Sequence, residues 1–284
     1  MADKKAKQEQ DSVVKKLLSS NLTWSVVALI VLIIICTISD HQFLSLSWNK
    51  NTGGLAGPLI TMLQESARYL MIATGMTLVI STAGIDLSVG SVMAVAGGAP
   101  LKWMANGFIL GIPANFVIAL IIVALVGLLC RKTAMGMMIE SVGINPEASR
   151  MTGIKPKKIL FLVYAVSGVL AAVAGLFATA SVMRVDVVKT GQDLEMYAIL
   201  AVVIGGTSLL GGKFSLAGSA LGAVIIAMIR KTIITLGIDS AATPAFFAAV
   251  VIVICVMQAP KIHNLSAEMK RKHALKAQTK AVAA

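Results

Sequence analysis

Long uncharged stretches alternate with short polar ones along almost the whole chain. Stretches of about 17 residues or more can cross the hydrocarbon core of a bilayer as helices, whereas those near 15 are short for a full crossing. The pattern therefore predicts an all-α, polytopic integral membrane protein with about eight apolar segments, some of them broken helices. The segments are residues 22–38, 69–83, 87–101, 114–130, 159–183, 196–210, 214–229 and 245–259.

Composition supports the same class of protein. Of the 284 residues, 57% are hydrophobic and only 13% are charged, about half the charged fraction of an ordinary soluble domain. The net charge of +12 is compatible in principle with nucleic-acid binding. The basic residues, however, gather in a few polar stretches beside the apolar segments, where they act as topology determinants.

These basic stretches predict the orientation of the chain. We expect a cytoplasmic amino-terminal tail (1–21), a transmembrane permease domain (22–259) with a long cytoplasmic loop at 131–158, and a basic cytoplasmic tail (260–284). The first apolar segment lacks a small-residue cleavage site after it, which favours an uncleaved span over a signal peptide.

Charge parity also bears on the segments between residues 69 and 101. If residues 69–101 cross the membrane twice, the next segment begins outside, and residues 114–130 run inward to place Arg131 and Lys132 in the cytoplasm. A single broken crossing would place these cations outside, so the positive-inside rule favours two crossings. Residues 39–68 and 230–244 then lie outside, although Arg230 and Lys231 violate the charge rule there.

A polar break bounded by Gly84 and Gly90 separates two of these uncharged segments, and Asp86 is the ionisable residue within it. One interpretation is a simple turn in which Asp86 caps the next helix by accepting from the N–H groups at Ser88 or Val89. The other is a discontinuous helix that lines a transport pathway, where irregular backbone is tolerated at depth. Gly84, Asp86, Ser88 and Gly90 are therefore candidate pathway residues.

A weak internal repeat points to a second break. Val79 and Ile80 precede the first break, and Val203 and Ile204 precede a similar glycine-bounded stretch. Transporters built from repeats place substrate sites at such breaks, although chance similarity between two glycine-rich segments is an alternative. The additional candidate pathway residues are Gly205, Gly206, Thr207 and Ser208. Farther along, Gly218 and Gly222 form a G-x-x-x-G pattern that predicts a close-packing helix face.

Within the loop at 131–158, a short helix is predicted. Asn145 is a suitable N-cap, Pro146 suits the first turn, Glu147 suits the positive helix end and Gly153 suits a stop. Two interpretations of this helix are open: it docks on a partner protein, or it is a solvated loop helix without a partner.

Several kinds of chemistry have no sequence support. Residues 206–214 resemble a phosphate-binding loop, but Thr207 and Phe214 occupy positions that require glycine and a hydroxyl residue. No nucleophile, base and orienting residue can be assembled, and no metal or cofactor motif is present. Since the predicted spans also lack arginine or lysine, a neutral substrate is expected. The cysteines show no paired spacing and fit packing roles; they are Cys36, Cys130 and Cys255.

Three blocks of sequence resemble the permease subunits of bacterial ABC sugar importers of the ribose and galactose type, in the branched-chain amino acid/sugar permease superfamily. They are GMTLVI followed by AGIDLSVGSV (75–92), RKTAMG followed by GIN and ASRMTGI (131–154), and EMYAI followed by AVVIGGTSL and GG (195–212). The resemblance implies a permease that imports a neutral monosaccharide. It also implies two ATPase subunits, a second permease copy or paralogue, and a periplasmic sugar-binding protein. The coupling helix to the ATPase would then involve Asn145, Glu147, Ala148, Arg150, Met151 and Gly153.

The chain departs from the family pattern in two places. Tyr197 stands where the family often has an acid, and residues 98–108 replace a region in which family members usually have further spans. The chain is therefore expected to be shortened internally. A secondary transporter or channel, and a truncated assembly subunit that does not transport, stay open as alternatives.

Overall fold

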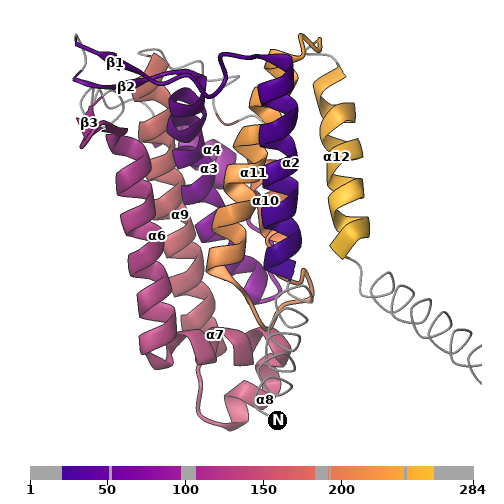
Figure 1. Ribbon diagram of the computed structural model, residues 1–284. Coiled ribbons are helices and arrows are strands. Elements are labelled where there is room, and N and C mark those ends of the chain that lie inside the picture. Colours follow the sequence, from indigo (N-terminus) through magenta and orange to yellow (C-terminus); the bar gives the residue numbers. More distant parts are fainter. Residues whose placement is uncertain are drawn as a thin grey trace, which may run out of the picture.

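A computed structural model describes residues 21–50, 53–96, 107–182, 191, 193–239 and 242–258 (Figure 1). Its helices are α2 (Asn21–Ser39), α3 (Pro58–Ser81), α4 (Val89–Ala96), α6 (Ala114–Lys132), α7 (Ala134–Ile144), α8 (Pro146–Met151), α9 (Pro156–Val182), α10 (Leu194–Ile204), α11 (Leu216–Thr235) and α12 (Thr243–Gln258). The tails predicted at 1–21 and 260–284 fall, apart from Asn21, outside the described residues, as do the end of the 87–101 segment and most of 183–192.

Four of these helices, α2, α6, α9 and α11, are long and apolar enough to cross a membrane. Apolar side chains on α2 and α6 stay exposed at their outer faces, among them Ile38 (70% exposed) and Leu129 (57%). Such faces suit lipid contact. The predicted all-α polytopic membrane class is confirmed, whereas the number of eight segments and the cytoplasmic termini remain predictions.

Helix α3 forms the centre of the bundle and packs against α6, α9, α10 and α11. From Ser66 to Ser81, every residue except Arg68 is buried. The helix begins at Pro58, whose fixed φ suits the first helical position, directly after Gly57. Helix α3 therefore begins about three turns before the apolar segment predicted at residues 69–83. That residues 39–68 lie on the outer side stays a prediction.

The two ends of the bundle differ in character (Figure 1). One end carries two short antiparallel hairpins, β1 (Ser47–Asn49) with β2 (Gly54–Ala56), and β3 (Phe108–Ile109) with β4 (Ile112–Pro113). We call it the hairpin end. The other end carries α7, α8 and the exposed cations Arg131, Lys132, Lys155, Lys157 and Lys158, and we call it the basic end. The sequence pattern predicted α8 but neither the hairpins nor α7.

Helices α10 and α11 approach each other closely through glycines. A Cβ atom on Gly218 would collide with the backbone of Gly205, and one on Gly222 would collide with the carbonyl of Ala201. The predicted close-packing face at Gly218 and Gly222 is therefore confirmed, and its partner is α10 of the same chain.

This contact predicts the effect of adding a single methyl group. Gly222→Ala should destabilise the protein by about 1–3 kcal/mol, because backbone atoms cannot yield as a side chain can. Gly168→Ala is the matched control, since Gly168 lies in α9 and a Cβ there meets nothing within 4 Å. The control should be neutral or stabilising by up to about 1 kcal/mol. Thermal unfolding of the purified variants measures both effects, and equal melting temperatures would contradict the packing account.

Candidate functional site

The break after α3 reverses the direction of the chain. The N–H groups of Thr82 and Ala83 donate to Val79 and Ile80, at 3.0 and 2.9 Å, and Ala83 has a φ of 60°. The chain then rises along α9 toward the hairpin end, since Gly84 lies against Tyr164 and Met93 lies against Gly175. The segments on either side of the break therefore run in opposite directions, as the charge argument favoured.

Asp86 lies two residues beyond Gly84 in this rising stretch and is only 4% exposed. Its Oδ1 accepts hydrogen bonds from the backbone N–H of Ser88 (3.0 Å) and the hydroxyl of Ser88 (2.6 Å), and its Oδ2 accepts from the Ser167 hydroxyl (2.8 Å). Ser167 is eleven residues beyond Pro156, the start of α9, or about 16 Å along the helix. The carboxylate therefore lies near the middle of a span, where only well-placed donors make it tolerable.

The predicted hydrogen bond from the Ser88 N–H to Asp86 is confirmed. It fixes the backbone two residues beyond Asp86, just before α4 begins. The contact with Ser167 was missed. No local pattern signals it, because the two residues are 81 positions apart.

Glycines allow the first break to pack tightly. A Cβ on Gly84 would lie 2.6 Å from the Tyr164 hydroxyl, and one on Gly90 would collide with the carbonyl of Gly191. Ser88 itself is exposed. Gly84 and Gly90 therefore hold the stretch against α9 and the start of α10, while Ser88 stays accessible.

The second break follows α10. Thr207 is buried, and its hydroxyl accepts from the N–H of Ser215 at 3.3 Å, whereas Ser208 is exposed and accepts from Leu210 N–H at 3.2 Å. Gly206 has a φ of 82°, which glycine adopts readily. Gly205 packs on the backbone of Gly218. The Thr207 and Ser208 hydroxyls therefore accept from nearby backbone N–H groups.

The two breaks meet at the basic end. The N–H of Gly212 donates to the carbonyl of Ser81 at 2.9 Å, and a Cβ on Gly211 would lie 2.8 Å from that of Ala83. Gly143 of α7 completes the contact, since a Cβ there would collide with the Ser81 carbonyl. We call Ser81, Gly143, Gly211 and Gly212 the glycine junction. Among the described residues, no hydrogen bond joins Asp86 or Ser88 to Thr207 or Ser208, so the two breaks touch at their ends only.

Helix α8 has the predicted local structure. The Asn145 side chain accepts from the Ala148 N–H at 3.0 Å, Pro146 begins the helix, Glu147 and Arg150 lie in its first and last turns, and Gly153 follows with a φ of 88°. Ser149 is its buried residue, whereas Met151 is 90% exposed. The helix therefore presents almost its whole surface to a potential partner.

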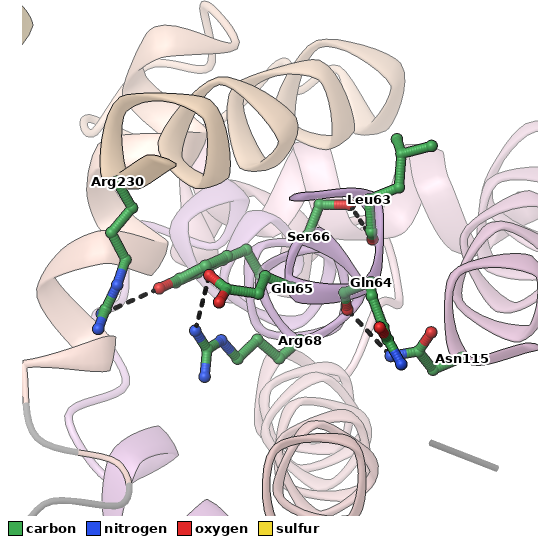
Figure 2. Close-up of polar contacts among 8 residues, drawn as sticks. Leu63, Gln64, Glu65, Ser66, Arg68, Asn115 and Arg230 are labelled. Carbon is green, nitrogen blue, oxygen red and sulfur yellow. Dashed lines mark hydrogen bonds and ion pairs between the residues drawn. The ribbon is translucent and has the colours of Figure 1, made fainter. Parts of the chain in front are cut away.

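The structure also reveals a polar group that sequence reasoning placed in outer loops. Arg230 lies inside α11, and its Nη1 donates to the hydroxyl of the buried Tyr69 at 3.2 Å. Arg68 and Glu65 lie inside α3 and form an ion pair at 3.4 Å (Figure 2). The premise that the spans lack arginine was therefore wrong. The violation of the charge rule at Arg230 was a signal of this error, because α11 extends past Arg230 to Thr235.

The Asp86 network predicts different outcomes for two substitutions. Asp86→Asn should fold, because an amide retains an acceptor for the Ser88 N–H and the serine hydroxyls can rotate. Asp86→Leu should cost about 1–3 kcal/mol, since it leaves the buried Ser167 hydroxyl and nearby donors without their acceptor.

Melting temperatures of the purified variants measure the difference. Ser167→Ala is the companion variant, since it removes one donor while leaving the carboxylate bonded to Ser88. Wild-type stability in both Asp86→Asn and Asp86→Leu would show that the carboxylate has no structural role here.

Comparison with known proteins identifies relatives. The family model described as the branched-chain amino acid transport system permease component matches residues 103–256. The chain is 70% identical to a fructose import permease protein of Bifidobacterium longum (strain NCC 2705), over 99% of both chains. It is 32% identical to a galactofuranose transporter permease protein of Escherichia coli (strain K12), over 75% of this chain and 83% of that protein. It is 28% identical to a ribose import permease protein of the same strain, over 84% and 92%. No solved structure matched.

The alignment with the Bifidobacterium protein also bears on the predicted shortening. It runs over 353 positions and includes 99% of a chain of 284 residues, so positions of the relative lie opposite gaps within this chain. That agrees with internal shortening, and its placement between Gly98 and Phe108 remains a prediction. The resemblance found in the sequence is confirmed. The chain therefore belongs to the branched-chain amino acid transport system permease family and is a multi-pass ABC-transporter permease of the cytoplasmic membrane.

Proposed function

We propose that this chain forms the inward pathway of an ABC importer for a neutral monosaccharide. The observation that carries the proposal is the 70% identity, over nearly the full length of both chains, to a protein named as a fructose import permease. More distant relatives are named for galactofuranose and ribose, so a neutral sugar is the common substrate class. The expectation of neutrality now rests on these names, since the supposed lack of arginine in the spans was wrong.

The complete importer would contain partners for energy and for substrate capture. We expect two ATPase subunits at the basic end, a second permease copy or a paralogue beside this chain, and a periplasmic sugar-binding protein at the hairpin end. In this orientation the exposed cations face the cytoplasm, in accordance with the positive-inside rule. The tails at 1–21 and 260–284 would lie on the same side.

Helix α8 would be the coupling helix that docks on the ATPase. It is capped at both ends, and exposed apart from Ser149, so a groove could receive it without unfolding it. We place Ala148 and Met151 on the docked face and Glu147 and Arg150 at its rim.

Helix α7 would carry movement from the ATPase into the membrane. It leads directly into α8 at Asn145, and Gly143, two residues earlier, lies in the glycine junction against Ser81 and Gly212. A displacement of α8 would therefore reach the ends of both breaks through backbone contacts, which are stiff because no side chain intervenes.

The breaks would line the pathway itself. Gly84, Asp86, Ser88 and Gly90 follow α9 through the middle of the bundle, and Gly205, Gly206, Thr207 and Ser208 lie closer to the basic end. The exposed hydroxyls of Ser88 and Ser208 would offer hydrogen bonds to a passing sugar. A half-helix that starts in the membrane can also direct its N-terminal N–H groups toward such a substrate.

A second function is favoured by the gaps in the alignment. A chain shortened by internal positions relative to a 70% identical permease could insert and assemble without forming a closed pathway. It would then be a non-transporting assembly subunit. Sugar uptake by a complex in which this chain is the sole permease separates the two functions.

Docking of α8 predicts the effect of Ala148→Arg. The substitution adds bulk and charge to the docked face, so we expect stimulated ATP hydrolysis by the reconstituted complex to be lost, while the permease inserts at normal abundance. An exposed residue without a partner should accept the change within about 0.5 kcal/mol.

Ala148→Ser is the control at the same position, because it adds a single oxygen atom and should leave hydrolysis unchanged. Binding-protein-stimulated hydrolysis in proteoliposomes is the measurement. Full stimulation in the Ala148→Arg complex would rule out α8 as the coupling element.

A further inference from the structure

Four side chains from two helices form a charged group in the half of the bundle nearer the hairpin end. Glu65, Arg68 and Tyr69 come from α3, and Arg230 comes from α11. The Arg68 guanidinium lies 5.0 Å above the Tyr69 ring, and the Tyr69 hydroxyl accepts from Arg230 at 3.2 Å. Figure 2 shows Arg68 and Arg230 on one side of α3, with Asn115 on the other. We call this group the arginine cluster.

The arginine cluster has more donors than its own acceptors use. The pair between Arg68 Nη2 and Glu65 Oε2 is 3.4 Å long, whereas charge-assisted hydrogen bonds of this kind are commonly about 2.7–2.9 Å. The Nε atom of Arg68 is buried without a hydrogen-bond partner among the described residues. Among the residues that the structure describes, no carboxylate lies within 4.0 Å of the Arg230 guanidinium. Buried donors are normally hydrogen-bonded, so the Arg68 Nε is a donor for which the described residues supply no acceptor.

The arginine cluster is also reachable from outside the chain. The Glu65 side chain is 40% exposed and that of Arg68 is 22% exposed, whereas every other residue from Ser66 to Ser81 is buried. Charged side chains within a membrane bundle commonly face its interior or a water-filled cavity and mark substrate pathways.

The arginine cluster and the Asp86 site lie along one face of α3. Arg68 and Gly75 are seven residues apart, so they lie on the same face, about 10 Å apart along the helix axis. Gly75 packs against Ser167, with a Cβ position 3.0 Å from the Ser167 Cα, and Ser167 bonds Asp86. Polar groups therefore follow each other along α3, from the hairpin end toward the middle of the bundle.

The chemistry of the arginine cluster matches a polyhydroxyl ligand. A carboxylate accepts hydrogen bonds only, a guanidinium donates only, and a sugar hydroxyl does both. We propose that Glu65, Arg68 and Arg230 bind neighbouring hydroxyls of the transported sugar before it reaches Asp86, one hydroxyl donating to Glu65 while it or its neighbour accepts from an arginine. Tyr69 is the positioning residue, because its ring and hydroxyl hold the two guanidinium groups. This proposal rests on the proposed sugar-import function.

Uptake kinetics of the complete complex in proteoliposomes test the assignment, with fructose and a set of monodeoxyfructoses as probes. Glu65→Gln and Arg68→Lys should each raise the KM for fructose on the order of tenfold, the effect of losing one charge-assisted hydrogen bond. In each variant, the preference for fructose over the deoxy sugar that lacks the bound hydroxyl should also fall, because the side chain that would bind this hydroxyl is already altered. Since the same binding protein delivers every sugar, a change in discrimination reports on the permease.

Asp40→Asn is the matched control, since it neutralises a carboxylate directly after α2 whose contact with the Gln42 N–H an amide oxygen can keep, and it should leave KM and discrimination unchanged. A uniform loss of uptake for all the sugars would indicate a structural role and overturn the assignment. Wild-type KM and discrimination in both Glu65→Gln and Arg68→Lys would also overturn the assignment, but this result would not contradict the import function. Failure of the wild-type complex to take up any of these sugars would overturn the import function and the assignment together.

Discussion

The architecture depends on one constraint, which is that backbone N–H and C=O groups inside a bilayer need partners within the protein. Two interrupted helices expose such groups at the end of α3 and after α10. The chain satisfies part of this need by joining the breaks to each other, since the Gly212 N–H donates to the carbonyl of Ser81 at 2.9 Å. Within the first break, the Asp86 carboxylate accepts from the Ser88 backbone N–H and from the Ser167 hydroxyl.

This solution has a mechanical consequence. The contact between the breaks is close only because Gly143, Gly211 and Gly212 lack side chains, and Gly143 belongs to the helix that leads into α8. The element proposed to meet the ATPase is thus connected to the irregular backbone in the membrane through main-chain atoms alone. Close-packed interiors transmit strain, so in the proposed importer a displacement of α8 would reach the breaks through these main-chain contacts.

Sequence patterns predicted the features that are local. Apolar runs located α2, α6 and α9 within a few residues, and cap and stop residues located α8 and the turn around Asp86. Features created by tertiary contacts were not predictable. Ser167 has no local relation to Asp86. Helix α3 begins before its apolar run and includes Glu65 and Arg68, which pair with each other. Helix α7 was treated as part of a loop because a run of 11 residues between basic stretches does not resemble a span.

The most direct test of this account is the distance between the Gly212 nitrogen and the Ser81 oxygen in the assembled importer, determined with and without bound ATP. If the glycine junction transmits the movement of α8, this distance stays near the 2.9 Å seen here in both states while α7, the end of α3 and residues 205–215 shift together. Separation of the two atoms in one state, with α8 still docked on the ATPase, would contradict the account.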